Sequence, residues 1–209
     1  VVPLSHGHKL ILQVIPLASL ADPQDYDVAQ FLDHKNTELA ALGTQSPNRR
    51  EFNLDGLADV YRVQDETARG YMQVNQNGII EAVDAGVVFS RTYTDKKYEN
   101  SISGVYTVHH LIRGLDNSLA LLRRLGCDTP IYAMVSMTGM RNLKLWHQNY
   151  AAMPRSCDRD DVIFQEVAIT DPAAKAVDIL RPTFDALWRT FGSEGCYYYG
   201  GDGVFRFPN

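Results

Sequence analysis

The stretch that decides the fold is Tyr71–Val83, which reads YMQVNQNGIIEAV. Two β-forming runs, Tyr71–Gln76 and Ile79–Phe89, lie on either side of Asn77-Gly78. Asn-Gly between such runs is typical of a type I′ hairpin, because both central residues of that turn need a positive φ. A third β-forming run, Leu57–Gln64, precedes the hairpin. The sequence therefore predicts an antiparallel meander over this whole span.

The segment before the meander predicts a strand, a helix and a loop. Lys9–Leu17 is a nearly continuous apolar run, which favours a central strand buried on both faces. Asp27 followed by Gln30 resembles a capping box and predicts a helix that ends at Gly43. The polar residues 44–56 then predict a loop that leads into the meander.

The segment after the meander predicts two helices, two strands and one long loop. Apolar residues at helical spacing predict a helix over Ser103–Leu125, and Gly126 ends it. Ile131–Met137 and Val162–Ile169 predict strands, and residues 138–161 between them predict a long loop. Asp171-Pro172 predicts the start of the last helix. Within that helix, Pro182 should kink or split the chain near Arg181.

These elements give the order β-α-β-β-β-α-β-β-α. We therefore predict an α+β fold, a mostly antiparallel sheet of five to six strands covered on one face by three helices. No linker rich in Gly, Ser or Pro divides residues 1–209, so we predict a single domain. Because the chain starts at Val1 rather than Met, we expect it to be the C-terminal part of a longer protein.

Composition and charge narrow the class of protein. The 209 residues are 45% apolar and 22% charged, which excludes collagen-like and disordered chains. With 20 basic and 25 acidic residues, the net charge of −5 gives no general attraction to nucleic acid. Three widely spaced cysteines match neither a zinc site nor a disulfide framework. The longest apolar runs are too short to cross a membrane, so we expect a cytoplasmic protein.

The histidines and acidic residues do not form a metal-binding pattern. His109 and His110 are adjacent on the predicted helix, so their side chains diverge by about 100° and do not serve one site together. We expect one to be partly exposed and the other buried or half-buried. The acidic run 158–161 lacks the glycine and glutamate of a calcium loop. Nucleophile elbows and phosphate-binding glycine motifs are also absent, so we predict no metal, no cofactor and no catalytic residue.

Two alternatives stay open. The first is a small-molecule hydrolase or transferase with a site under the 138–161 loop, built from His110, His147, Cys157 and Asp160. The second is weak binding of single-stranded nucleic acid by arginines and tyrosines of the meander, although neighbouring acidic residues offset their charge. The same face is the predicted contact surface for a protein partner, because Tyr and Arg are enriched in interfaces. The four residues of this binding surface are Arg50, Tyr61, Arg62 and Tyr71.

Several segments resemble the C-terminal region of bacterial proteins whose N-terminal part is a Schlafen-type AlbA_2 domain, described as DNA-binding or ATP-binding. They are Val14–Leu17, Arg50–Leu57, Gly70–Val83, the pattern Pro182-x-Phe184-Asp185-x-Leu187-Trp188, and Asp202-Gly203. The resemblance implies a non-catalytic accessory domain, acting as a sensor, regulatory or oligomerisation module. Its partners would be the AlbA_2-type domain of the same chain or further copies of itself, with nucleic acid contacted only indirectly. The motifs are structural, so the resemblance assigns no catalytic residue.

Overall fold

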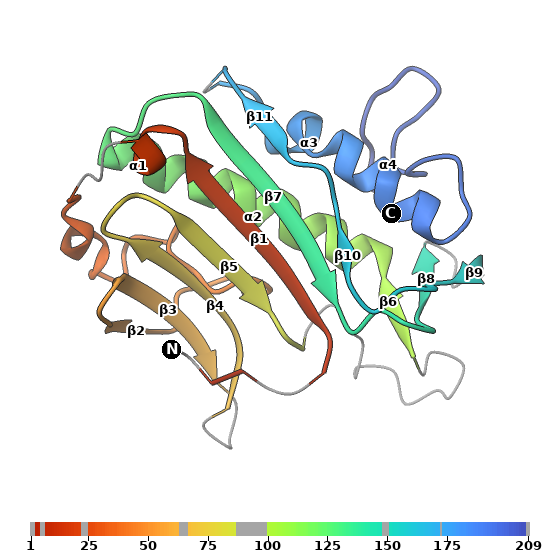
Figure 1. Cartoon of the computed structure of the whole chain (residues 1–209), viewed down its shortest axis with the longest axis horizontal. Helices are drawn as coiled ribbons and strands as arrows, with labels where there is room; N and C mark the ends of the chain where they lie inside the picture. Colours follow the sequence, from red (N-terminus) through yellow and green to blue (C-terminus); the bar gives the residue numbers. More distant parts are fainter. Residues whose placement is uncertain are drawn as a thin grey trace.

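A computed structural model describes residues 3–4, 7–21, 25–62, 67–86, 100–147, 151–171 and 173–207, with the backbone alone at residues 147 and 151–154. Its centre is an eight-stranded sheet in the order β10-β7-β1-β5-β4-β3-β2, with β11 also paired to β7 (Figure 1). All pairs in this sheet are antiparallel. The strands are β1 (Lys9–Pro16), β2 (Arg49–Phe52), β3 (Gly56–Arg62), β4 (Ala68–Asn75), β5 (Ile80–Asp84), β7 (Ile131–Thr138), β10 (Val162–Ile163) and β11 (Val167–Ile169). The mixed fold with a mostly antiparallel sheet is as predicted, although it has more strands.

Strand β1 lies at the middle of the sheet, between β5 and β7, as predicted. Its burial alternates, with Leu10, Leu12 and Val14 fully buried and the residues between them half-buried. The prediction that both faces of β1 are buried is therefore wrong. Helix α2 (Gly104–Leu125) crosses one face of the sheet (Figure 1). The buried residues of β1 face this helix, because Leu12 Cδ2 lies next to Gly114 of α2.

Helix α2 forms where the sequence predicts it. The Ser103 hydroxyl accepts a hydrogen bond from the Tyr106 amide at 3.3 Å, and Gly126 ends the helix with a φ of 74°. In the middle of the helix, a Cβ atom on Gly114 would lie 2.7 Å from Leu42 Cδ1 and 3.1 Å from Leu12 Cδ2. The absence of a side chain at Gly114 therefore brings α2 close to β1 and to the loop that carries Leu42.

The hairpin at the centre of the meander exists, but its turn is not type I′. Gly78 has a φ of 86°, whereas Asn77 is not among the residues with positive φ. The Gly78 amide donates to the Asn75 carbonyl at 2.9 Å, and the Asn75 amide donates to the Ile79 carbonyl at 2.9 Å. This is the pattern of a type I turn followed by a glycine bulge, which needs only one left-handed residue.

The segment predicted as a long loop, residues 138–161, contains two strands instead. β8 (Lys144–His147) pairs in parallel with β6 (Ser101–Ser103) and antiparallel with β9 (Ala151–Ser156), which makes a second, three-stranded sheet. Leu143, Leu145 and Ile102 are buried in the main core. This burial fixes the segment against the rest of the domain, and the loop prediction is wrong.

The remaining helices are short. They are α1 (Ala18–Ala21), the 3₁₀ turn η1 (Val28–Phe31), α3 (Ala176–Ile179) and α4 (Arg181–Thr190). The break before Arg181 lies where Pro182 predicts a split, and Pro182 is in the first turn of α4. The last helical segment begins at Ala176 and not at Asp171, because the Asp171 carboxylate caps only a local turn, accepting from the Ala173 amide at 2.9 Å. Among the described residues, no helix has the length and hydropathy needed to cross a bilayer.

Candidate functional site

A pocket of about 440 Å³ lies between the loop at residues 40–45 and the first half of α2. Residues of α2 from Val105 to Asn117 form one wall, and Phe207 closes one side. This volume lies within the range of small-molecule sites, which are usually concave and mostly apolar with a few placed polar groups. The site therefore depends on two things, the position of the loop and the side chains that α2 presents.

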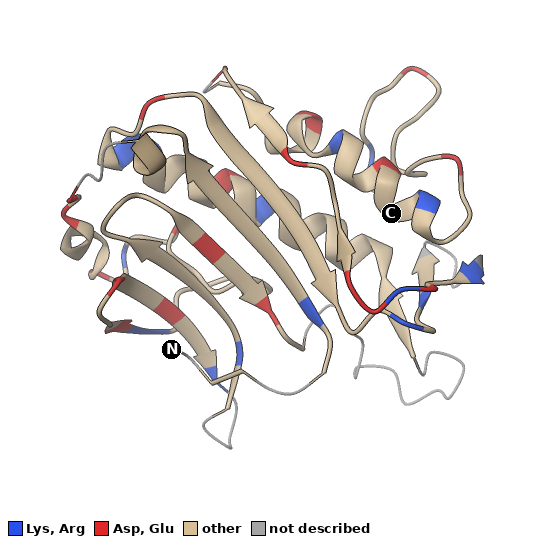
Figure 2. Ribbon diagram, viewed as in Figure 1, with Lys and Arg blue, Asp and Glu red and all other residues tan. Residues whose placement is uncertain are grey.

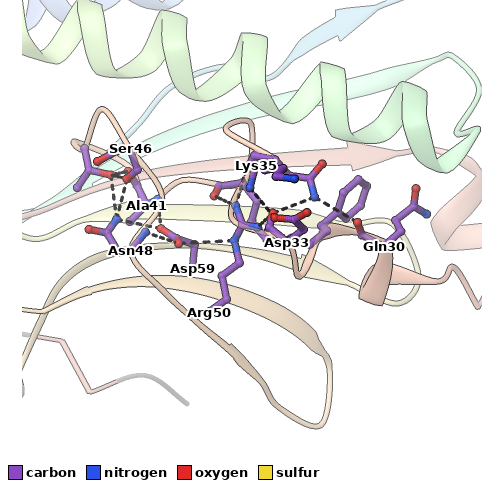
Figure 3. Close-up of polar contacts among 12 residues, drawn as sticks. Gln30, Asp33, Lys35, Ala41, Ser46, Asn48, Arg50 and Asp59 are labelled. Carbon is purple, nitrogen blue, oxygen red and sulfur yellow. Dashed lines mark hydrogen bonds and ion pairs between the residues drawn. The ribbon is translucent and has the colours of Figure 1, made fainter.

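The loop is held by a buried arginine on strand β2. The Arg50 guanidinium donates to the carbonyl oxygens of Phe31 at 2.5 Å and Leu39 at 3.0 Å, and to those of Asp33 and Asn36 (Figure 3). One side chain thus binds four points along residues 31–39. A continuous helix would use those carbonyls internally. The helix predicted between Asp27 and Gly43 is therefore reduced to the single turn η1.

Asp59 on β3 completes this support. Its carboxylate accepts from the amides of Ala41 at 2.8 Å and Asn48 at 2.6 Å, and from Asn48 Nδ2 at 3.0 Å. Arg50 Nε lies 3.9 Å from Asp59 Oδ1, and the two side chains are 1% and 0% exposed (Figure 3). Burial lowers the pKa of Arg50, and the negative charge of Asp59 opposes that shift. The buried pair thus fixes Ala41, one of the residues that line the pocket.

A buried carboxylate positions one histidine of the pocket. His110 Nδ1 lies 3.2 Å from Asp84 Oδ2, and the two side chains are 9% and 0% exposed. Asp84 Oδ1 accepts from the Gly86 amide at 2.9 Å. In the tautomer that this contact favours, the N–H at Nδ1 donates to the carboxylate oxygen. That leaves Nε2 of His110 as the ring nitrogen available to a ligand, since it bonds to no described residue.

The second histidine, His109, lies beside His110 and nearer the surface. Its ring centroid is 5.9 Å from those of His110 and Phe207. Burial lowers its pKa, and the nearby His110 and Arg113 lower it further. His109 is half-buried and His110 buried, as predicted for adjacent helical residues. No cluster of three or more metal-ligating side chains occurs in the described parts of the chain.

The four residues of the predicted binding surface do not form one surface. Tyr71 is the cross-strand partner of Val60, so these two side chains share one face of the sheet. Tyr61 follows Val60 in the strand and therefore points to the other face. Arg62 lies on the same face as Tyr71 and forms an ion pair with Glu51, in which Nη2 is 2.6 Å from Oε1. The hydroxyl of Tyr71 donates to Glu81 on this face. Burial and this bond raise the pKa of Tyr71. Arg50 lies on the other face and is occupied by the loop.

The four residues of the predicted enzyme site are not gathered together either. Cys157 is buried, and its thiol donates to the Arg159 carbonyl at 3.3 Å. Asp160 is exposed and lies 3.6 Å from Arg141. Neither lines the pocket that contains His110, and the side chain of His147 lies outside the described residues. Positive and negative residues both lie on the meander strands, so acidic side chains offset the positive charge that the nucleic-acid alternative needs (Figure 2).

Sequence reasoning missed the residues that make this pocket. Asp84 lies within the predicted strand Ile79–Phe89 with no motif around it, and Arg113 lies within the predicted helix Ser103–Leu125 without being singled out. Residues 40–43 of the loop were assigned to the predicted helix that ends at Gly43, and only residues 44–45 to the predicted loop. The one useful signal was His110, which belongs to the site but with different neighbours from those predicted.

The chain was compared with protein-family models, with curated proteins and with solved structures, and none of the three comparisons found a match. The fold and the pocket are therefore interpreted from their own geometry.

Proposed function

We propose that this chain is a non-catalytic accessory module that senses a small molecule in the pocket between α2 and the loop at residues 40–45. The observation that carries the proposal is the paired His110 and Asp84 at the pocket. Asp84 is fully buried and fixes the His110 ring, while Nε2 of His110 has no partner among the described residues. A buried polar network held in one orientation favours selective recognition.

The loop at residues 40–45 supports this proposal, because side chains from three other elements hold it in position. On the side of the sheet, Arg50 of β2 and Asp59 of β3 hold residues 31–48. On the side of helix α2, Arg113 Nη2 donates to the Gln45 carbonyl at 2.5 Å. A pocket wall held from both sides is pre-organised, which lowers the entropic cost of binding. The partner in this proposal is an AlbA_2-type domain of the same chain, as the sequence resemblance implies. This domain would respond to the bound molecule.

The test is retention of small molecules by the full chain. The protein is equilibrated with a metabolite extract, separated by ultrafiltration, and the retained compounds are identified by mass spectrometry. Asn117→Trp places a large ring in the pocket wall, and Asp116→Trp places the same ring on the adjacent exposed position of α2. We expect a compound that wild type and Asp116→Trp retain and Asn117→Trp does not. Equal retention by all three proteins would contradict the proposal.

A second candidate function is general-base catalysis, favoured by the same histidine and aspartate. A histidine oriented by a buried carboxylate is a common proton acceptor in enzymes. The pocket's hydroxyl groups come from Thr44 and Tyr106, and Thr44 Oγ1 is already bonded to the Ala41 carbonyl at 2.8 Å. His110 would therefore activate water rather than a serine or a cysteine.

This candidate predicts hydrolysis of activated esters such as p-nitrophenyl acetate above the background rate. It also predicts that His110→Gln abolishes the activity, whereas His109→Gln, a change at the neighbouring position, reduces it less. Activity that is absent in wild type, or equal in the two variants, would exclude His110 as the base.

A further inference from the structure

The lining of the pocket differs in charge from the rest of the protein. The chain carries a net charge of −5, yet no described residue that lines the pocket is Asp or Glu. The titratable or cationic lining groups are His109, His110 and Arg113 on α2, together with the Tyr106 phenol. The facing loop at residues 40–45 and Phe207 add no charged side chain. The Asp84 carboxylate is bonded to Nδ1 of His110 and does not line the pocket, so Arg113 is the permanent charge that a ligand meets at the pocket surface, and it favours an anion.

Arg113 is oriented before any ligand arrives. Its Nη2 donates to the Gln45 carbonyl at 2.5 Å, which ties the guanidinium to the loop across the pocket. The guanidinium has five N–H donors, and Arg113 makes no other hydrogen bond to the described residues. The remaining donors form part of the planar fork that binds a carboxylate or a phosphate through two oxygens.

Next to this cation, aromatic rings follow one another along the pocket. The ring centroids of Tyr106 and His110 are 6.1 Å apart, those of His110 and His109 5.9 Å, and those of His109 and Phe207 5.9 Å. The interplanar angles range from 36° to 62°. At these separations neighbouring rings are in contact with one another, so together they form one aromatic surface on which the ring of a ligand can pack.

We propose that the ligand of this pocket is a small anion that carries a flat aromatic ring. Its carboxylate or phosphate lies on Arg113, its ring packs among Tyr106, His109 and Phe207, and a donor group of the ligand reaches Nε2 of His110. This inference rests on the proposed function, because it names the class of molecule that the pocket senses.

The experiment uses five probes with the full chain. 2-Naphthoate is an aromatic carboxylate, 2-naphthamide is its neutral counterpart, and hexanoate is a carboxylate without a ring. Adenosine 5′-monophosphate is an aromatic phosphate, and adenosine is its neutral counterpart. Affinities come from ¹⁵N–¹H spectra, with the shifted amides mapped to residues 40–45 and 105–117. We expect at least one aromatic anion to bind about tenfold or more tightly than its neutral counterpart and than hexanoate. The two anions distinguish a carboxylate ligand from a phosphate ligand.

Arg113→Gln should weaken the binding of that anion about tenfold or more, and Arg123→Gln, which lies on the same helix outside the pocket, should leave it unchanged. Because Arg113 also ties down the loop, Arg113→Lys is the second variant. It keeps the charge without the planar fork, so its affinity should fall between those of wild type and Arg113→Gln.

The outcomes separate the two proposals. Neutral probes that bind the pocket as tightly as the anions would overturn the assignment of an anion and leave the sensing function standing. If none of the five probes binds while other compounds shift the pocket amides, the assignment of an aromatic anion is likewise overturned and the sensing function stands. If no compound of any class shifts the amides of residues 40–45 and 105–117, both proposals fail.

Discussion

Replacing Arg50 with alanine removes the side chain that holds residues 31–39 in place. The change leaves four loop carbonyls without their donor and leaves the buried Asp59 without a nearby cation. We expect Arg50→Ala to destabilise the domain and to release the loop that lines the pocket. The substitution thus tests whether a structural arginine, rather than local helix formation, shapes the site.

The size of the effect follows from the burial of the pair. Removing one partner of a buried ion pair costs about 3–5 kcal/mol. Four hydrogen bonds to a charged group, at about 1.5–3 kcal/mol each, would sum to more than this. The freed carbonyls belong to a loop that can turn toward water, so the smaller figure applies. Against a typical domain stability of about 5–15 kcal/mol, the variant should be much less stable than wild type.

The assay is urea unfolding, combined with hydrogen exchange of the amides of residues 32–48. Arg49→Ala is the matched control, because Arg49 is the neighbouring residue and its side chain is 77% exposed. We expect a loss of less than about 0.5 kcal/mol for this control. If Arg50→Ala proves too unstable to purify, Arg50→Lys offers three donors instead of five and should lose about 1–3 kcal/mol. Equal stability and equal exchange in Arg50→Ala and Arg49→Ala would refute the reasoning.

Three further predictions concern the same region. Asp84→Asn replaces one of the two buried carboxylate oxygens that bond to Gly86 and His110 by an NH₂ donor and should cost about 1–3 kcal/mol in urea unfolding, whereas Asp158→Asn, at an 86% exposed side chain, should cost almost nothing. Gly70→Ala would place a Cβ 2.8 Å from the carbonyl oxygens of Leu42 and Val83, so it should cost about 1–3 kcal/mol, while Gly201→Ala, which meets nothing within 4 Å, should be neutral. The folded pKa of His109 lies below its ordinary value of 6.5, so the unfolded chain binds more protons between the two values and stability falls as the pH drops through that window. His109→Gln should therefore flatten this part of the stability curve, and an unchanged curve would contradict the assignment.

Local patterns predicted the parts of the fold that depend on local interactions. The Asn77-Gly78 turn, the end of α2 at Gly126 and the break at Pro182 each act within a few residues, and each is found at the predicted place. The predicted helix after Asp27 failed for the opposite reason. Its backbone carbonyls bind Arg50, which lies well beyond the segment along the chain, and no local pattern signals that competition.

The pocket could not be predicted from the sequence, because it too depends on contacts between residues that are far apart in the chain. Asp84 and His110 are 26 residues apart and belong to different elements. The loop wall depends on Asp59, whose carboxylate would be read from sequence as an ordinary surface charge of a strand. The short strand β8 was missed because Leu145 owes its burial to the main core, which also contains Ile102, rather than to a repeating pattern, and β9 is defined by its pairing with β8.

The most direct test of the central claim, that the pocket beside α2 binds a small molecule, is a screen of a diverse fragment set against the ¹⁵N-labelled full chain. The readout is which amides shift on binding. We expect the shifted amides to lie at residues 40–45 and 105–117, and we expect these shifts to disappear in Asn117→Trp but to persist in Asp116→Trp. Shifts that gather elsewhere on the fold, or that both variants share with wild type, would contradict it.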